Sequence, residues 1–154
     1  MDPMTFLRRL IVACSEDIGL ANPQAMVQSV TAMDAYHKIG WPESKYIISQ
    51  AILFAVESPK SNSIPLAIMR AQELMERVKS AEVPLHLRDT HYKGAEKLGH
   101  KGYLYPHNYP GHFVRQQYLP DEIQHEVIFA ATNQGTEEKM KQNQLKRRGT
   151  PTDS

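Results

Sequence analysis

Apolar residues recur every three or four positions through roughly the first half of the chain, which is the spacing of one face of an α-helix. Breaks rich in glycine, proline, serine and asparagine divide this pattern into separate stretches. We therefore expect four helices, over about residues 3–14, 23–39, 44–57 and 64–80.

The predicted helix starts carry recognisable signals. Asp2 precedes Pro3, and Asn22 precedes a proline as well, so each pair offers a capping side chain followed by proline in the first turn. The polar residues 15–17 interrupt the first apolar pattern, and we expect the first helix to end there. Gly19 then suits a turn or a left-handed cap.

The third predicted helix, Ser44 to Glu57, differs from the others because it is apolar almost all round. A helix without a polar face is usually buried on several sides. The pattern therefore predicts that this helix lies at the centre of the fold.

The helical pattern disappears beyond about residue 83. We expect a long looped segment with one short helix at Lys93–Leu98 and a short strand at Glu126–Ala131. A last polar helix is expected from Gly135 to about Arg148, followed by a frayed tail over residues 149–154.

The composition of the 154 residues is that of one ordinary globular domain. The net charge is only +1, so any contact with nucleic acid requires a local basic patch. Cys14 is the single cysteine, which excludes an intramolecular disulfide and favours a reducing compartment. It lies in an apolar run, so we expect a buried, inert thiol. No stretch approaches the ~20 apolar residues of a membrane span.

The segment from His86 to Asp121 combines histidine, tyrosine and basic residues in a way that nothing before it does. Its five histidines show no helical i,i+4 pair and have no cysteine nearby, so we expect no metal site. Asp89 and His91 could orient one another, but no nucleophile stands in a catalytic context. Neither GxxxxGK[ST] nor GxGxxG occurs, so these two nucleotide-binding motifs are excluded.

Two interpretations of this segment remain open. Its cations could neutralise phosphates while its aromatic rings stack on unpaired bases. Alternatively, the tyrosines could cover the helical core and leave the lysines solvated. The candidate contacts to DNA or to another subunit are Arg88, His91, Lys93, Lys97, His100, Lys101, Tyr103, Tyr105 and Arg115. The basic cluster at residues 146–148 is interpreted as a solvated tail.

Two stretches resemble a known family. SEDIGLANP (15–23) and VPLHLRDTHYKGAEKLGHKGYLYPHNYPGHFVRQQYLPD (83–121) are similar to the C-terminal region of replication-associated recombination protein A, the RarA/MgsA family of AAA+ ATPases. Werner-helicase-interacting proteins are its eukaryotic relatives. PKSNS (59–63) is similar to the family as well, and the resemblance extends to about Lys141. At His112 we would expect glycine or another small residue.

The resemblance implies an all-α, post-AAA+ oligomerisation domain, like the collar of clamp loaders, with a long looped C-terminal extension. Residues 1–20 would be the end of the ATPase lid region and 21–148 the oligomerisation domain. That domain would comprise a helical half over 21–82, the looped extension over 83–134 and the terminal helix over 135–148. Residues 149–154 would be a disordered tail.

The resemblance also implies what the parent protein does. It would be a DNA-dependent ATPase that maintains replication forks and acts in recombination, with ATP and magnesium held in an upstream module. We expect no catalytic, cofactor or metal residue in this fragment. Expected partners are further copies of the chain, most simply as a tetramer, and DNA through the full-length protein. Single-stranded-DNA-binding protein and other replication proteins are candidate partners. The expected location is bacterial, cytoplasmic and nucleoid-associated, without a membrane contact.

The alternative function is direct binding of single-stranded or forked DNA through segment 86–121. An independent hydrolase or metal enzyme is the third interpretation, and the residues support it least.

Overall fold

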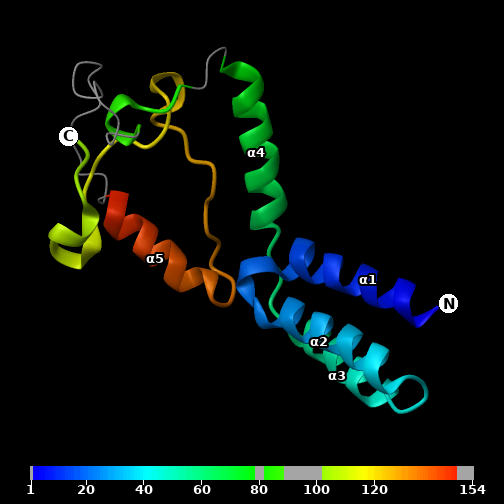
Figure 1. Cartoon of the computed structure of the whole chain (residues 1–154). Coiled ribbons are helices and arrows are strands. Elements are labelled where there is room, and N and C mark those ends of the chain that lie inside the picture. Colours follow the sequence, from blue (N-terminus) through cyan, green and yellow to red (C-terminus); the bar gives the residue numbers. More distant parts are fainter. Residues whose placement is uncertain (1, 79–81, 89–101, 149–154) are drawn as a thin grey trace. The chain divides into compact units, whose positions relative to one another are not determined.

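The computed structural model of the chain describes residues 2–78, 82–88 and 102–148 (Figure 1). This part is all-helical, as the sequence predicts, and it contains no strand. None of its helices is both long and apolar enough to cross a membrane. The α-helices are α1 (Pro3–Ala13), α2 (Gln24–Ile39), α3 (Lys45–Glu57), α4 (Ser63–Arg77) and α5 (Glu137–Arg148).

The chain forms two compact units. Unit 1 comprises Met1–Met69 together with Phe129–Ser154, and unit 2 comprises Arg70–Ile128. The assignment of residues 1–20 to the end of an ATPase lid, and the subdivision of 21–148, stay predictions. The predicted helix at Lys93–Leu98 and the predicted tail at 149–154 lie outside the described residues.

The core of unit 1 is built where α1, α2 and α3 pack together (Figure 1). One buried cluster combines Leu7 with Ala32, Ile48 and Ala51. Alanine at these positions lets the helix backbones approach closely, so each long apolar side chain fills the remaining space. Full burial of a side chain such as Leu7 contributes about 1.5–3 kcal/mol.

A second buried cluster contains Cys14, which confirms the expectation of a buried thiol. Its Sγ lies 3.2 Å from Oγ of Ser29, and that hydroxyl donates to the carbonyl of Ala25 at 2.8 Å. The thiol is therefore enclosed between α1 and α2 with a polar neighbour.

The predicted cap and the predicted bounds of α1 are both confirmed, since the α-helix ends at Ala13 and its end was expected at about residue 14. The Asp2 carboxylate accepts from the amides of Met4 and Thr5, and the hydrogen bond from Thr5 lowers the pKa of Asp2. The sequence did not predict that the polar residues 15–17 would keep a helical backbone of another kind. The chain continues as a π-helical turn, Cys14–Ile18, and a 3-10 turn, Gly19–Ala21. The polar residues stay helical because they face outward while Cys14 and Ile18 remain buried.

The expectation that the third helix is buried on several sides is also wrong within this chain. α3 buries Ile48, Ala51 and Ala55 along one stripe. Its opposite face leaves Tyr46 72%, Leu53 62% and Val56 63% exposed. One monomer supplies neighbours for only one face of this apolar helix.

The remaining predictions concern two helices and one strand. The terminal helix is confirmed as α5, and the fourth helix is confirmed as α4. The predicted strand at Glu126–Ala131 is wrong, because side chains take its backbone groups in place of a second strand. Arg70 donates to the carbonyl of Val127 at 2.8 Å, and the amide of Ala131 donates to Oε1 of Gln144 at 3.2 Å.

Candidate functional site

Two of the stretches that carry the family resemblance meet in unit 1. The amide of Ser61 donates to the carbonyl of Asp17 at 2.8 Å. The Asn22 side chain donates to Oγ of Ser58 at 3.0 Å. Residues 15–23 are thus joined to the linker before α4 by bonds that use the backbone as well as side chains. We call this region, with the C-terminal residues described next, the polar junction.

The start of α5 enters the same junction. The amide of Thr136 donates to the carbonyl of Ala21 at 2.9 Å, and its hydroxyl donates to the carbonyl of Leu20. Gly135 lies against this contact with φ +50, and a Cβ placed there would stand 2.0 Å from the Ala21 carbonyl oxygen. Only glycine fits, because both the left-handed backbone and the close approach exclude a side chain.

Glu137 is the buried carboxylate of the polar junction, with none of its surface exposed. Its two oxygens accept from the Ser63 hydroxyl at 2.6 Å and from the Thr132 amide at 2.7 Å. Burial alone would raise the pKa of Glu137, but the hydrogen bonds from Ser63, Thr132 and Ser61 outweigh it and hold the pKa below its usual value. The positive ends of α4 and α5 act in the same direction, because Ser63 and Glu137 are the first residues of these helices.

The polar junction is therefore a structural joint. Its carboxylate is enclosed, and its hydrogen-bonding capacity is directed at Ser63 and Thr132 within unit 1. A buried anion whose two oxygens each accept from a different segment is suited to holding those segments together.

The exposed face of α3 is the second notable feature of unit 1. Tyr46, Ser49, Gln50, Leu53 and Glu57 share this face at helical spacing. Together with Gln28 of α2 and Phe54, they line an open depression of about 540 Å³. A monomer that leaves neighbouring large apolar side chains exposed commonly uses them as a binding surface.

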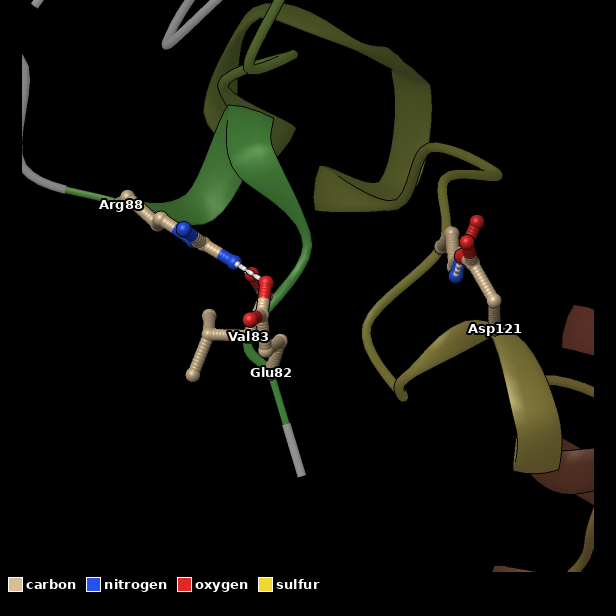
Figure 2. Close-up of polar contacts among 5 residues, drawn as sticks. Glu82, Val83, Arg88 and Asp121 are labelled. Atoms are coloured by element: carbon tan, nitrogen blue, oxygen red, sulfur yellow. Dashed lines mark hydrogen bonds and ion pairs between the residues drawn. The ribbon is translucent and has the colours of Figure 1, made fainter. Parts of the chain in front are cut away.

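In unit 2, the described part of the basic-aromatic segment places Arg88 in an ion pair. Figure 2 shows its guanidinium directed at Glu82, with an N–O distance of 2.7 Å. The same side chain donates from Nε to the carbonyl of Val83 at 2.7 Å. The charge of Arg88 is thus largely committed within the chain, which weakens it as a phosphate contact.

Arg88 borders a cavity of about 450 Å³. Asp121, labelled in Figure 2, lines the same cavity. Its carboxylate accepts from the side-chain amide of Gln117 at 2.7 Å. The other lining residues are Glu82, Val83, Pro84, Leu85, Pro120 and Glu122.

The tyrosines of the segment that the structure describes, at 103, 105, 109 and 118, are exposed, contrary to the interpretation that they cover a core. Tyr103 is 48% and Tyr105 53% exposed. Gln116 holds this region, because its side-chain amide accepts from the Leu104 amide at 3.1 Å and donates to the Leu104 carbonyl at 2.7 Å. One side chain thus replaces the pair of bonds that a neighbouring strand would make.

The described histidines of unit 2 make separate local contacts. Nε2 of His86 lies 2.7 Å from the carbonyl oxygen of Gln117, and the rings of His107 and His112 are 4.9 Å apart. No group of three metal-binding side chains gathers within the described residues. His112 has φ +52, a backbone conformation that favours glycine, which accounts for the expectation of a small residue there.

The structure describes only four of the nine candidate contact residues. Arg88, Tyr103, Tyr105 and Arg115 are described, and all lie in unit 2. The other five candidates, His91, Lys93, Lys97, His100 and Lys101, lie outside the described residues. Whether any of the nine touches DNA or a subunit stays a prediction.

Sequence reasoning missed the residues of the polar junction. Gly135, Thr136 and Glu137 looked like an ordinary helix start, and α3 looked like a central helix. The available signal was the sequence similarity at 15–23 and 59–63, which marked two of the three segments that meet there.

Comparison with known proteins identifies the family. The family described as "MgsA AAA+ ATPase C terminal" matches residues 1–148. Replication-associated recombination protein A of Bacillus subtilis is 42% identical over 135 residues, which are 87% of this chain and 32% of that protein. The protein of the same name from Escherichia coli K12 is 32% identical over 141 residues, 90% of this chain and 32% of its own length.

A eukaryotic protein is similar as well. ATPase WRNIP1 of Dictyostelium discoideum is 33% identical over 130 residues, 83% of this chain and 15% of that protein. The chain therefore spans about a third or less of the length of these relatives. The resemblance noted in the sequence is confirmed: the chain belongs to the family of MgsA AAA+ ATPase C-terminal regions.

Proposed function

We propose that this chain is the oligomerisation domain of a DNA-dependent AAA+ ATPase that acts in replication-fork maintenance and recombination. The family match and the names of the bacterial relatives support the parent's role. In this proposal ATP and magnesium bind in a module outside this fragment, and the fragment performs no catalysis itself.

The observation that carries the oligomerisation proposal is the exposed apolar face of α3. Tyr46, Leu53 and Val56 lie along one side of a helix whose other side is packed in the core. Burial of such side chains contributes about 1.5–3 kcal/mol each, so association that covers them is strongly favoured. Further copies of the same chain, most simply in a tetramer, are the proposed partners.

Light scattering of the purified chain tests this proposal. We expect a mass above that of the 17.5 kDa monomer. Tyr46→Asp combined with Leu53→Asp should produce monomers, because two charges would then face the apolar partner surface. Met75→Asp is the matched control, since Met75 is an apolar side chain that is 76% exposed on a different helix, α4. A wild-type monomer at high concentration would overturn the proposal, as would equal dissociation in the control.

A second candidate function is direct binding of single-stranded or forked DNA by segment 86–121. The exposure of Tyr103 and Tyr105 favours it, since exposed rings can stack on unpaired bases. Tyr103→Ala with Tyr105→Ala should then weaken binding to a labelled single strand about tenfold or more. Unchanged affinity in that variant would remove these tyrosines as contacts.

A further inference from the structure

Helix α5 carries a concentration of positive charge that the packing of unit 1 does not use. After Glu138 the helix contains five cations and no acidic residue. The helix as a whole carries +3, whereas the rest of the chain sums to −2. A helix that is merely solvated commonly pairs its charges with opposite ones three or four residues away. Only Lys141 stands three or four residues from an acidic residue of the helix, whereas Lys139, Lys146, Arg147 and Arg148 have none at that spacing within α5.

The structure orients this charge. One side of α5 contacts the rest of unit 1 through Glu137, Lys141 and Gln144, which are spaced four and three residues apart. Lys141 donates to the Asn133 side chain at 2.9 Å, and Gln144 binds the backbone of Phe129 and Ala131. The buried Glu137 fixes the start of the helix. The opposite side therefore points away from the packed surface.

That opposite side presents Lys139, Gln142, Asn143 and Lys146, all exposed and at the i, i+3, i+4 and i+7 spacing of one helical face. Arg147 is exposed beside them. Neither lysine forms a salt bridge within residues 2–78, 82–88 and 102–148. The helix dipole explains cations near the C-terminal end, but it does not explain Lys139 in the first turn, where a positive charge is unfavourable.

We propose that this face of α5 is a binding surface for the phosphate backbone of DNA. Lys139 and Lys146 lie about 10.5 Å apart along the helix axis, close to the rise of three base pairs of a duplex. The amides of Gln142 and Asn143 stand between them and can donate to further phosphate oxygens. Contacts to phosphate oxygens carry no sequence information, so binding through them has no sequence preference.

The choice of DNA as the polyanion rests on the proposed role in replication and recombination. The surface itself is distinct from segment 86–121 and from the apolar face of α3. DNA binding by this face of α5 can therefore be tested separately from both proposed functions.

The test uses fluorescence anisotropy of the whole chain with a labelled duplex and with one of its strands. The probe variant is Lys139→Gln with Lys146→Gln. The control is Arg9→Gln with Lys38→Gln, which removes the same charge from exposed positions on α1 and α2. The probe variant should bind about tenfold more weakly at low salt and lower the salt slope for duplex by about 1.8. The control should stay within about twofold of wild type.

Lys139→Arg with Lys146→Arg should retain wild-type binding, which separates loss of charge from loss of helix. Circular dichroism checks the helix in each variant, and light scattering on the same samples reports the oligomeric state independently of DNA affinity. Absence of DNA binding by the wild-type chain would overturn the proposal. Equal weakening in probe and control variants would also overturn it, as would binding to vesicles of anionic lipid without binding to DNA.

Discussion

Unit 1 and unit 2 differ in the kind of contact that stabilises each of them internally. In unit 1 the backbone of one segment approaches the backbone of another, as where Thr136 donates to the carbonyl of Ala21. In the described part of unit 2, distant segments are joined mainly by hydrogen bonds between side chains and the backbone. The two bonds between the Gln116 side chain and the backbone of Leu104 are an example. Backbone contacts tolerate almost no added atom, whereas a side chain can be shortened or moved. The same substitution should therefore cost more in unit 1 than in unit 2.

The sharpest test of this difference is a pair of glycines with left-handed backbone. Gly135→Ala should destabilise the chain by about 3–5 kcal/mol, because the new Cβ meets the Ala21 carbonyl in addition to the unfavourable φ. Gly111→Ala has a similar φ of +67 but open space around it, so it should cost only about 1 kcal/mol. Urea denaturation measures both. Equal costs would show that crowding at Gly135 is unimportant.

The next largest effect concerns carboxylates. Glu137→Gln should cost about 2 kcal/mol, because one oxygen that accepts from Ser63 or Thr132 becomes an amide group that cannot accept. The control in unit 2 is Glu126→Gln, which removes the exposed ion pair with Arg77 at 3.0 Å. Exposed pairs contribute ~0.5 kcal/mol or less, so this variant should be nearly as stable as wild type. Similar losses in thermal unfolding would contradict the comparison.

The pH dependence follows from the lowered pKa of Glu137. A carboxylate whose pKa is lower in the folded state contributes stability above its unfolded pKa and loses it as the pH falls through the folded value. Wild type should therefore lose more stability than Glu137→Gln between about pH 5 and about pH 3. The pKa of Asp2 is lowered too, but Asp2 is present in both proteins, so the difference isolates Glu137. Parallel pH curves would refute this assignment.

The smallest predicted effect lies in unit 2. Gln116→Ala removes both bonds to Leu104 and the bond to the Tyr118 hydroxyl, at a cost of about 1 kcal/mol because water replaces these exposed contacts. Hydrogen exchange of the Leu104 amide should accelerate, while the amide of Thr136 in unit 1 keeps its protection. If the Thr136 amide accelerates equally, the two units do not behave separately.

Local pattern was sufficient for much of the fold. The helices α1 to α5, the cap at Asp2 and the burial of Cys14 were predictable, because they depend on neighbours within a few residues. The strand at 126–131 was predicted wrongly. Its backbone groups depend on distant partners, since Arg70 and Gln144 take the groups that a second strand would have paired.

The candidate site shows the same division. Sequence pattern identified the basic and aromatic character of segment 86–121, but it did not show that Arg88 is paired with Glu82 or that Tyr103 and Tyr105 are exposed. It also treated the cations at residues 146–148 as a solvated tail. The attachment of α5 through Glu137 and Gln144 gives the charges of Lys146 and Arg147 a fixed direction, which periodicity alone does not supply.

The sequence by itself determined the family, the all-helical class and the apolar character of α3, because each of these properties depends on residue types and their spacing along the chain. Tertiary structure alone decided that Gly135 and Glu137 join three distant segments, since a close approach exists only after the chain has folded. It also decided which face of α3 is covered within one chain and which stays exposed. A sequence pattern shows that one face of a helix is apolar, but only the packing of the folded chain determines what covers that face.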